Sequence, residues 1–165
     1  MIRKKVIDID MHKFNDAKES TAKEGLIIKI YLPIKYIGKI ELAVNARILN
    51  ICDIDNEIIE VGGNVNEVSL RDNKCKIAID SNQDIKIDII SHTGSLEINQ
   101  VSAASCLLLP NSYNFRLVKK GISTNVYFEK NGMKTEDFSD KSSNNFIEFN
   151  GISRENLPVW DWKRT

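Results

Sequence analysis

Only a few side chains in this sequence could carry out nucleophilic catalysis, because the chain has two histidines and three cysteines. His92, in the segment Ser91-His92-Thr93-Gly94, precedes Cys106 by 14 residues. A fold that placed the two side by side would give a thiolate–imidazole pair. No signature of a cysteine enzyme surrounds either residue, and local hydrogen bonding at a turn explains His92 more simply. We therefore expect no catalytic residue and no enzymatic activity.

A short acidic segment suggests a second kind of chemistry, the binding of a divalent cation. Asp53, Asp55 and Glu57 alternate with other residues as the first ligands of a calcium loop do. The glycine that an EF-hand loop needs at its sixth position is Ile58 here, and its twelfth position is Asn64 instead of Glu. A loose cation site at an acidic corner stays open, but carboxylates that face water explain the segment more simply. We expect no metal site and no cofactor.

The glycine pair Gly62-Gly63 does not form a phosphate-binding loop, because no Lys-Ser or Lys-Thr follows it. A tight corner with positive φ explains the two glycines better. A hexapeptide-repeat acyltransferase is also disfavoured, because the aliphatic residues do not keep the six-residue spacing of such enzymes.

The elements that must position these residues lie between Lys39 and Gln100, where a repeat is visible. Pairs of aliphatic residues separated by one residue recur with steps of 19, 18 and 19 residues between their first members. The pairs are Ile40 and Leu42, Ile59 and Val61, Ile77 and Ile79, and Leu96 and Ile98. A near-constant step of this size is typical of stacked repeats, in which each unit covers the apolar face of its neighbour.

Alternation with period two places each aliphatic pair on one face of a strand. A second apolar cluster follows each pair: Ile48 and Ile51, then Val68 and Leu70, then Ile85, Ile87 and Ile89. Asn45, Asn64 and Asn82 come three residues after the first three pairs. Asparagine tolerates left-handed backbone angles, and stacked amides can bond from row to row, so we expect corners at these positions.

These features predict an all-β chain that forms a single-stranded β-solenoid of parallel coils of about 19 residues. A single domain, 1–165, would comprise N-terminal strands and a cap (1–36), regular coils (37–110), and less regular coils with a C-terminal cap (111–165). Within it, we expect a strand over 26–32, a hairpin at Asn131-Gly132, and a strand over 146–149 that ends in a turn at Asn150-Gly151. An antiparallel sandwich is the competing fold.

Composition limits the partners that this chain could have. Its formal net charge is zero, from 23 basic and 23 acidic residues, and its longest basic cluster is Arg3-Lys4-Lys5. A nucleic-acid-binding protein usually carries a basic surplus or patch, so we expect no nucleic acid partner. No apolar run has the length of a signal peptide core or a membrane span. We expect no membrane insertion and a cytoplasmic location; association with a cell surface stays open.

Cys52, Cys75 and Cys106 are irregularly spaced and odd in number, which predicts free thiols in a reducing compartment.

The repeats between Lys39 and Gln100 resemble the adhesin-like family of bacterial β-solenoid domains labelled DUF4097. The resemblance includes Ile30-Tyr31-Leu32-Pro33 before the repeats and Leu107-Leu108-Leu109-Pro110 after them. Gly38-Lys39-Ile40-Glu41-Leu42 and Gly94-Ser95-Leu96-Glu97-Ile98 are similar to repeats of that family. The resemblance covers about residues 26–130. It implies a right-handed solenoid and no established enzymatic residues.

Two functions fit these observations. The first is a non-catalytic binding or adhesin-like module that contacts an unknown protein or ligand through a solenoid face or its loops. The second is a self-assembling scaffold in which solenoids stack end to end as a homo-oligomer. Larger aromatic residues after 110 favour a capped end, which would block such stacking at one side.

Overall fold

The structure is a computed structural model. It describes residues 27, 29–33, 36–101, 103, 105–110, 112–122, 126–130, 133–135, 139–152 and 157–160. The chain divides into two compact units, Met1–Leu32 and Pro33–Thr165, and every described strand belongs to the second unit. The described residues form strands and no helix, as the sequence predicts.

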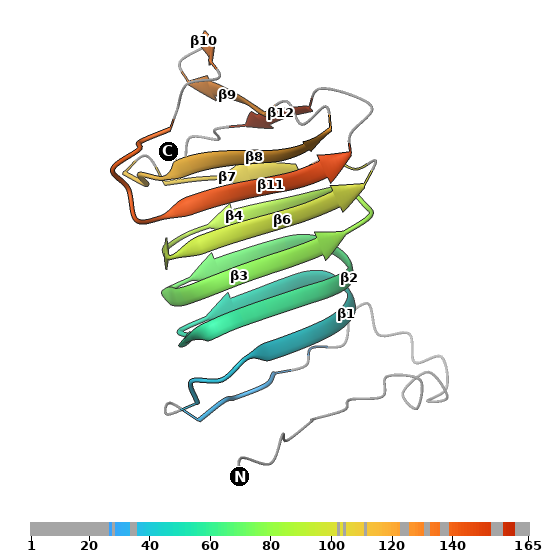
Figure 1. Ribbon diagram of the computed structural model, residues 1–165. Coiled ribbons are helices and arrows are strands. Elements are labelled where there is room, and N and C mark those ends of the chain that lie inside the picture. Colours follow the sequence, from blue (N-terminus) through green and yellow to red (C-terminus); the bar gives the residue numbers. More distant parts are fainter. Residues whose placement is uncertain are drawn as a thin grey trace. The chain divides into compact units, whose positions relative to one another are not determined.

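The strands of the second unit form two sheets (Figure 1). They are β1 (Ile40–Cys52), β2 (Asp55–Arg71), β3 (Asn73–Ser81), β4 (Ile85–Ile89), β5 (His92–Thr93), β6 (Ser95–Val101), β7 (Ser105–Leu108), β8 (Arg116–Ile122), β9 (Val126–Lys130), β10 (Met133–Thr135), β11 (Phe146–Ile152) and β12 (Leu157–Trp160). The larger sheet has nine strands, and all its pairings are parallel. The smaller sheet contains β10, β9 and β12.

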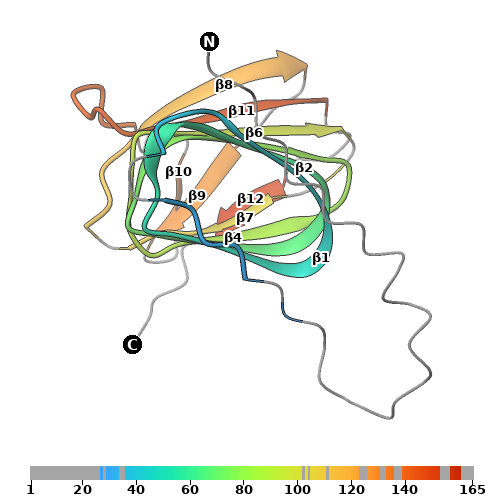
Figure 2. The same ribbon diagram turned by 90° about the horizontal axis from the view of Figure 1, so that it is seen from below.

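The larger sheet is wound into a right-handed β-solenoid. In Figure 1 the strands β3, β6, β11 and β8 run left to right along the front while the stack rises, and β4 and β7 return behind them. β2 is long because it bends around a corner: its first half pairs with β3 and its second half, Glu67–Leu70, pairs with β4. Viewed along the stack, the coils superimpose around one apolar interior (Figure 2).

The register of the front strands is the one that the repeat predicts. Ile59 lies opposite Ile40 on one side and Ile77 on the other, and Ile77 lies opposite Leu96. Ile59 is 1% exposed, while Ile77 and Leu96 are 0% exposed. Identical or similar aliphatic residues therefore stack in one internal column. The stacking predicted from the repeat is confirmed.

The rear column differs from the sequence-based prediction at one residue. Leu49, not Ile48, lies opposite Val68, and Val68 lies opposite Ile87. Ile48 lies opposite Glu67 and is 44% exposed. The strand alternates with period two through Ile51, so Leu49 shares its inward face and Ile48 faces outward.

The prediction that asparagines adopt positive φ at the corners is wrong. Among the described non-glycine residues, positive φ occurs at Asp53 (59°) and Asp72 (54°), and not at Asn64. Gly63, directly before Asn64, has φ of 113°, so the expectation for the glycine pair is confirmed at this position. Glycine adopts positive φ without strain because it has no Cβ, so Gly63 takes this conformation and Asn64 does not. Asn64 stays within β2, and its backbone N–H donates to Asn45 Oδ1 at 3.3 Å.

The predicted N-terminal strand over 26–32 is wrong for the residues that are described. Ile27 and Lys29–Pro33 are not assigned to a strand. A strand needs a backbone ladder with a partner, and no pairing of these residues is found within the described part of the chain. The rest of the segment 1–36, apart from Tyr36, lies outside the described residues.

The C-terminal part contains an insertion that the repeat did not predict. β11 lies between β6 and β8 and pairs in parallel with both, although β8 precedes β11 in the chain. Ile147 thus continues the internal column between Leu96 and Leu117. The turn expected at Asn150-Gly151 is wrong, because β11 extends to Ile152 and both residues are paired on each side.

The smaller sheet confirms the predicted C-terminal cap. Met133 lies opposite Lys130 in antiparallel β9 and β10, while the residues of the predicted turn, Asn131-Gly132, lie outside the described residues. The sheet lies beyond β8 in Figure 1 and across the outline of the coils in Figure 2. It therefore covers that end of the stack, which would otherwise present apolar rows to water.

The insertion of β11 leads to a prediction about local stability. Within the described residues, β8 pairs with β11 alone, whereas β3 pairs on both sides. Opening of β11 therefore releases β8 as well. In native-state hydrogen exchange we expect the amides of β8 to exchange roughly tenfold or more faster than those of β3. Equal protection of the two strands would contradict this hierarchy.

Candidate functional site

The structure does not bring His92 and Cys106 together as a catalytic pair. His92 is 5% exposed and lies opposite Asn73 at an internal corner. Cys106 lies opposite Lys86 on the outward face of the rear strands, where its neighbour Leu107 points inward. The three cysteines are unpaired, as predicted. Burial raises the pKa of Cys75 to about 11, with a smaller contribution from the charge of Asp55, so this thiol is a poor nucleophile at neutral pH.

The buried polar corner around His92 has a structural role. Asn73 is 1% exposed; its Nδ2 donates to the carbonyl of Ile51 at 2.8 Å, and its Oδ1 accepts from the N–H of Ile54 at 3.2 Å. These bonds tie one coil to the next. Burial lowers the pKa of His92; the nearby backbones of Ser95 and Asn73 act in the opposite direction, but neither ring nitrogen makes a hydrogen bond of standard geometry.

This burial predicts that the protein becomes less stable in mild acid. The folded state holds His92 neutral, whereas the unfolded chain binds a proton below the ordinary histidine pKa of 6.5. The free energy of unfolding should therefore fall as the pH drops below that value, by up to about 1.4 kcal/mol per pH unit from this residue. His92→Asn should remove this part of the loss, measured by urea unfolding at several values between pH 7.5 and 5. An identical loss in both proteins would contradict the assignment.

The carboxylates of the acidic segment lie at an exposed corner. Asp53 lies 3.8 Å from the guanidinium of Arg71, and Asp55 and Glu57 are exposed. Among the described residues, no group of three or more His, Cys, Asp or Glu side chains is arranged to hold a metal ion. Asp55 and Glu57 thus face water at a corner of the coil, as the simpler explanation of this segment predicts.

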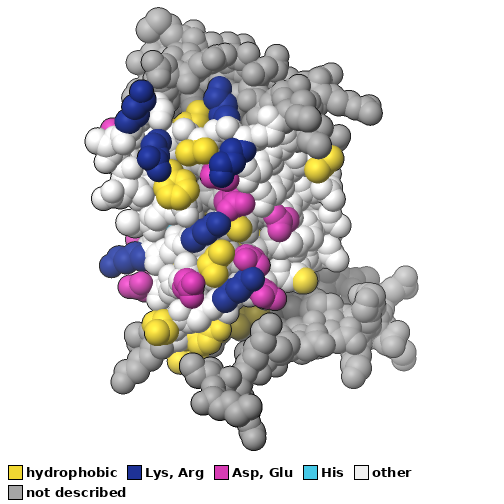
Figure 3. Space-filling view, viewed as in Figure 1, with side chains coloured by type: hydrophobic (Ala, Val, Ile, Leu, Met, Phe, Trp, Pro, Cys, Tyr) yellow, Lys and Arg dark blue, Asp and Glu magenta, His cyan; other side chains and the backbone are white. Residues whose placement is uncertain are grey.

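The outer face of the front strands carries ion pairs between neighbouring rows. Basic and acidic side chains lie on it, with apolar side chains between them (Figure 3). Lys39 pairs with Glu60 at 2.7 Å, Lys76 with Glu97 at 2.6 Å and Lys120 with Glu148 at 2.8 Å. The last two pairs join neighbouring strands, and the first joins β2 to the residue directly before β1, so charge is neutralised from row to row. Exposed pairs of this kind contribute little to stability, about 0–1 kcal/mol each.

Two like charges meet where β6 and β11 pair, because Glu97 lies directly opposite Glu148. Such a pair is destabilising unless it is compensated. Asn150 Nδ2 lies 3.2 Å from Glu97 Oε1 and 3.0 Å from Glu148 Oε1. Lys76 and Lys120 flank the two carboxylates from the neighbouring strands. The hydrogen bond with Lys76, the largest influence, lowers the pKa of Glu97, so this carboxylate stays ionised at neutral pH.

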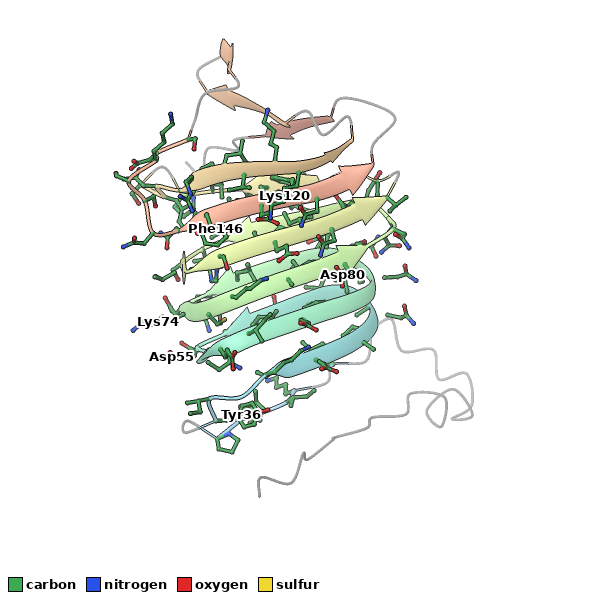
Figure 4. All side chains as sticks on the ribbon, viewed as in Figure 1. Tyr36, Asp55, Lys74, Asp80, Lys120 and Phe146 are labelled. Carbon is green, nitrogen blue, oxygen red and sulfur yellow. The ribbon has the colours of Figure 1, made fainter. Side chains whose placement is uncertain are left out.

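A ladder of amide and carboxylate groups crosses the same face at the next outward position. Asn99 Nδ2 donates to Asp80 Oδ1 at 2.6 Å, and Asn150 Nδ2 donates to Asn99 Oδ1 at 2.8 Å. Lys120 occupies the following position of the ladder on β8. Figure 4 shows Asp80 on β3 and Lys120 higher on the same face. Hydrogen bonding between side-chain amides of neighbouring rows, which we expect of stacked asparagines, is thus found at Asn99 and Asn150, whereas Asn45 accepts from the backbone N–H of Asn64.

An open groove of about 350 Å³ borders this ladder. It is lined by Asp80, Ser81, Asn82, Asn99, Gln100, Val101, Gly121, Asn150 and Gly151. Gly151 lies between Gln100 and Gly121 in the sheet, so two adjacent rows carry no side chain there. Gly121 has φ of 107°, and a Cβ at this position would overlap the backbone of Gly151. The backbone itself therefore forms part of the groove wall.

The sequence contained a signal for this site that spacing alone did not reveal. Leu96-Glu97-Ile98-Asn99 and Ile147-Glu148-Phe149-Asn150 share one pattern, an apolar residue, Glu, an apolar residue and Asn. A step of 51 residues separates them, far from the 19 of the regular coils. Comparison of the patterns, instead of the spacing, would have identified β11 as the neighbour of β6.

The described residues contain no helix long and apolar enough to cross a membrane. Comparisons with protein families, with curated proteins and with solved structures found no match for this chain.

Proposed function

We propose that this protein is a non-catalytic binding module that contacts a partner through the groove and polar ladder on its front face. The observation that carries the proposal is the mutual fixing of Asp80, Asn99 and Asn150 by hydrogen bonds at 2.6 and 2.8 Å beside an open groove. Polar groups that are already held in position lose little conformational freedom when a partner binds. The resemblance of the rows to adhesin-like DUF4097 domains favours the same function, and the three unpaired cysteines favour a reducing compartment such as the cytoplasm.

A differential pull-down tests this function. Val101 borders the groove and is 52% exposed, so Val101→Arg should obstruct binding without disturbing the core. Asn50→Ala is the matched control, because Asn50 is an exposed residue of β1 opposite Ser69, in the rear rows. We expect cell-extract components that are retained by the wild type and by Asn50→Ala, and lost from Val101→Arg. Equal retention by all three proteins, or by none, would contradict the proposal.

End-to-end assembly is the alternative, and it requires both ends of the solenoid to be free. The small sheet of β9, β10 and β12 lies across the end next to β8 (Figure 2). We therefore expect light scattering after size-exclusion chromatography to give the same small mass at two protein concentrations tenfold apart. A mass that rises with concentration would favour the scaffold function instead.

A further inference from the structure

The short strand β5 forms the corner that leads into β6, and His92 is buried inside this corner. The imidazole is 5% exposed, and neither ring nitrogen makes a hydrogen bond of standard geometry with the described residues. β5 pairs with β3 through its two residues, His92 opposite Asn73 and Thr93 opposite Lys74. A corner held by so few backbone pairs can open while the long strands around it stay closed.

Gly94 follows His92 by two residues and joins this corner to the start of β11. Its N–H donates to Asn145 Oδ1 at 3.0 Å, and its carbonyl oxygen accepts from the N–H of Phe146 at 3.2 Å. Gly94 has φ of 122°, and a Cβ there would overlap the carbonyl oxygen of Cys75, so the corner is closely packed against β3. An outward movement of β5 therefore breaks both hydrogen bonds to the start of β11.

Asn145 extends this connection to β8. Its carbonyl oxygen accepts from the N–H of Arg116 at 2.9 Å, and its Nδ2 donates to the carbonyl of Asn114 at 3.3 Å. Within the described residues, β8 pairs with β11 alone. One asparagine therefore links the corner that contains His92 to β11 and β8, the two strands above β6 in Figure 1.

His92 is the group of this corner that changes charge in mild acid. The other titratable side chains that the neighbouring corners and strands contribute are Asp72, Lys74, Cys75, Tyr113, Arg116 and Asp140. Burial raises the pKa of Cys75 to about 11 and that of Tyr113 to about 12, so both stay neutral in mild acid. Histidine is the residue type whose ordinary pKa lies between pH 5 and 8. Its protonation places a charge in a buried site, and the imidazolium reaches water when the corner opens.

We propose that the corner of β5 is a pH-sensitive latch: protonation of His92 opens it and releases the start of β11, and β8 with it. Histidine has its ordinary pKa of 6.5 in the open corner, so the open state gains up to about tenfold over the closed state between pH 7.5 and 5.5. The coils below are not part of the latch, because β3 is paired on both sides, with β2 and with β6. The inference thus concerns local opening, beyond the loss of overall stability in acid.

Hydrogen exchange followed by mass spectrometry at pH 7.5 and 5.5 tests the latch, with rates corrected for the effect of pH on an unfolded chain. In the wild type we expect peptides from β11 and β8 to exchange about three- to tenfold faster at pH 5.5 after this correction, while peptides from β2 keep their protection. His92→Asn should remove the change. Asparagine suits this corner, because Asn73 lies directly opposite His92 one coil earlier and bonds there to the backbones of Ile51 and Ile54.

A second variant, Asn145→Ala, breaks the latch without changing the titrating group. We expect it to speed exchange in β11 and β8 already at pH 7.5 and to leave β2 protected. Asn144→Ala is the matched control, because Asn145 and not its neighbour bonds to Gly94 and Asn114. No response in the wild type, an equal response in His92→Asn, a response of the same size in β2, or unchanged exchange in Asn145→Ala would overturn the inference. The protein is measured alone, so these outcomes are independent of the proposed binding function.

Discussion

Replacement of Ile77 by alanine is expected to lower the free energy of unfolding by about 2–5 kcal/mol. Ile77 is 0% exposed and lies between Ile59 and Leu96 in the internal column. Removal of its branched side chain leaves a cavity, and the two neighbouring rows cannot close it because their backbones are hydrogen-bonded to β3 on both sides. Urea unfolding followed by circular dichroism measures the change.

The control for this substitution is Ile48→Ala, which makes the same chemical change in a strand of the same sheet. Ile48 faces outward and is 44% exposed, so its removal creates no cavity. We expect a loss of less than about 1 kcal/mol there. Similar losses at both positions would mean that the inward and outward faces have been assigned wrongly.

Replacement of Gly63 by alanine is expected to cost at least about 2 kcal/mol, although only one methyl group is added. Gly63 has φ of 113°, which a residue with a Cβ adopts only with strain. The added Cβ would also overlap the carbonyl oxygen of Val44 in the adjacent coil. Since that oxygen belongs to the backbone of the ladder, it cannot rotate away, and the corner must shift.

Its neighbour in sequence is the matched control. A Cβ at Gly62 would meet no atom within 4 Å, and Gly62 does not have positive φ. Gly62→Ala should be neutral or stabilising by about 0.4–1 kcal/mol, because alanine restricts the unfolded chain. Thermal unfolding of the two variants side by side measures the difference. Equal melting temperatures would contradict the corner geometry.

The regular coils could be predicted from the sequence because each row is defined by residues close together in the chain. Ile59 and Val61 alternate within one strand, and a step of 19 or 18 residues brings the next pair to the same place. Parallel, in-register stacking is then the arrangement that buries every pair. The glycine corner at Gly63 followed from the same local reasoning. The choice of Ile48 over Leu49 failed because Ile48 and Ile51 are three residues apart and cannot share one face of a strand, whereas Leu49 and Ile51 can.

The candidate site could not be predicted in the same way, since its residues come from rows that are not successive in the chain. Leu117 and Ile147 each offer an aliphatic residue to the row above Leu96, but at the next position on the same face β8 carries Lys119 where β11 carries Phe149. In the structure Ile147 takes this row, which sets Asn150 beside Asn99 and keeps Lys120 next to Glu148. A β8 strand next to β6 would instead place Lys120 beside Asn99, and the amide ladder would end at that residue.

The sequence by itself therefore determined the period of the coil, the internal aliphatic column and the need for a cap, because these depend on alternation and repetition along the chain. Only the tertiary structure decided the order of the upper strands, and with it the groove lined by Asp80, Asn99 and Asn150. The physical reason is that this row is filled by a strand distant in the chain: β11 buries Ile147 and Phe149 at the positions where β8 carries Leu117 and Lys119, and the 19-residue step gives no indication of this exchange.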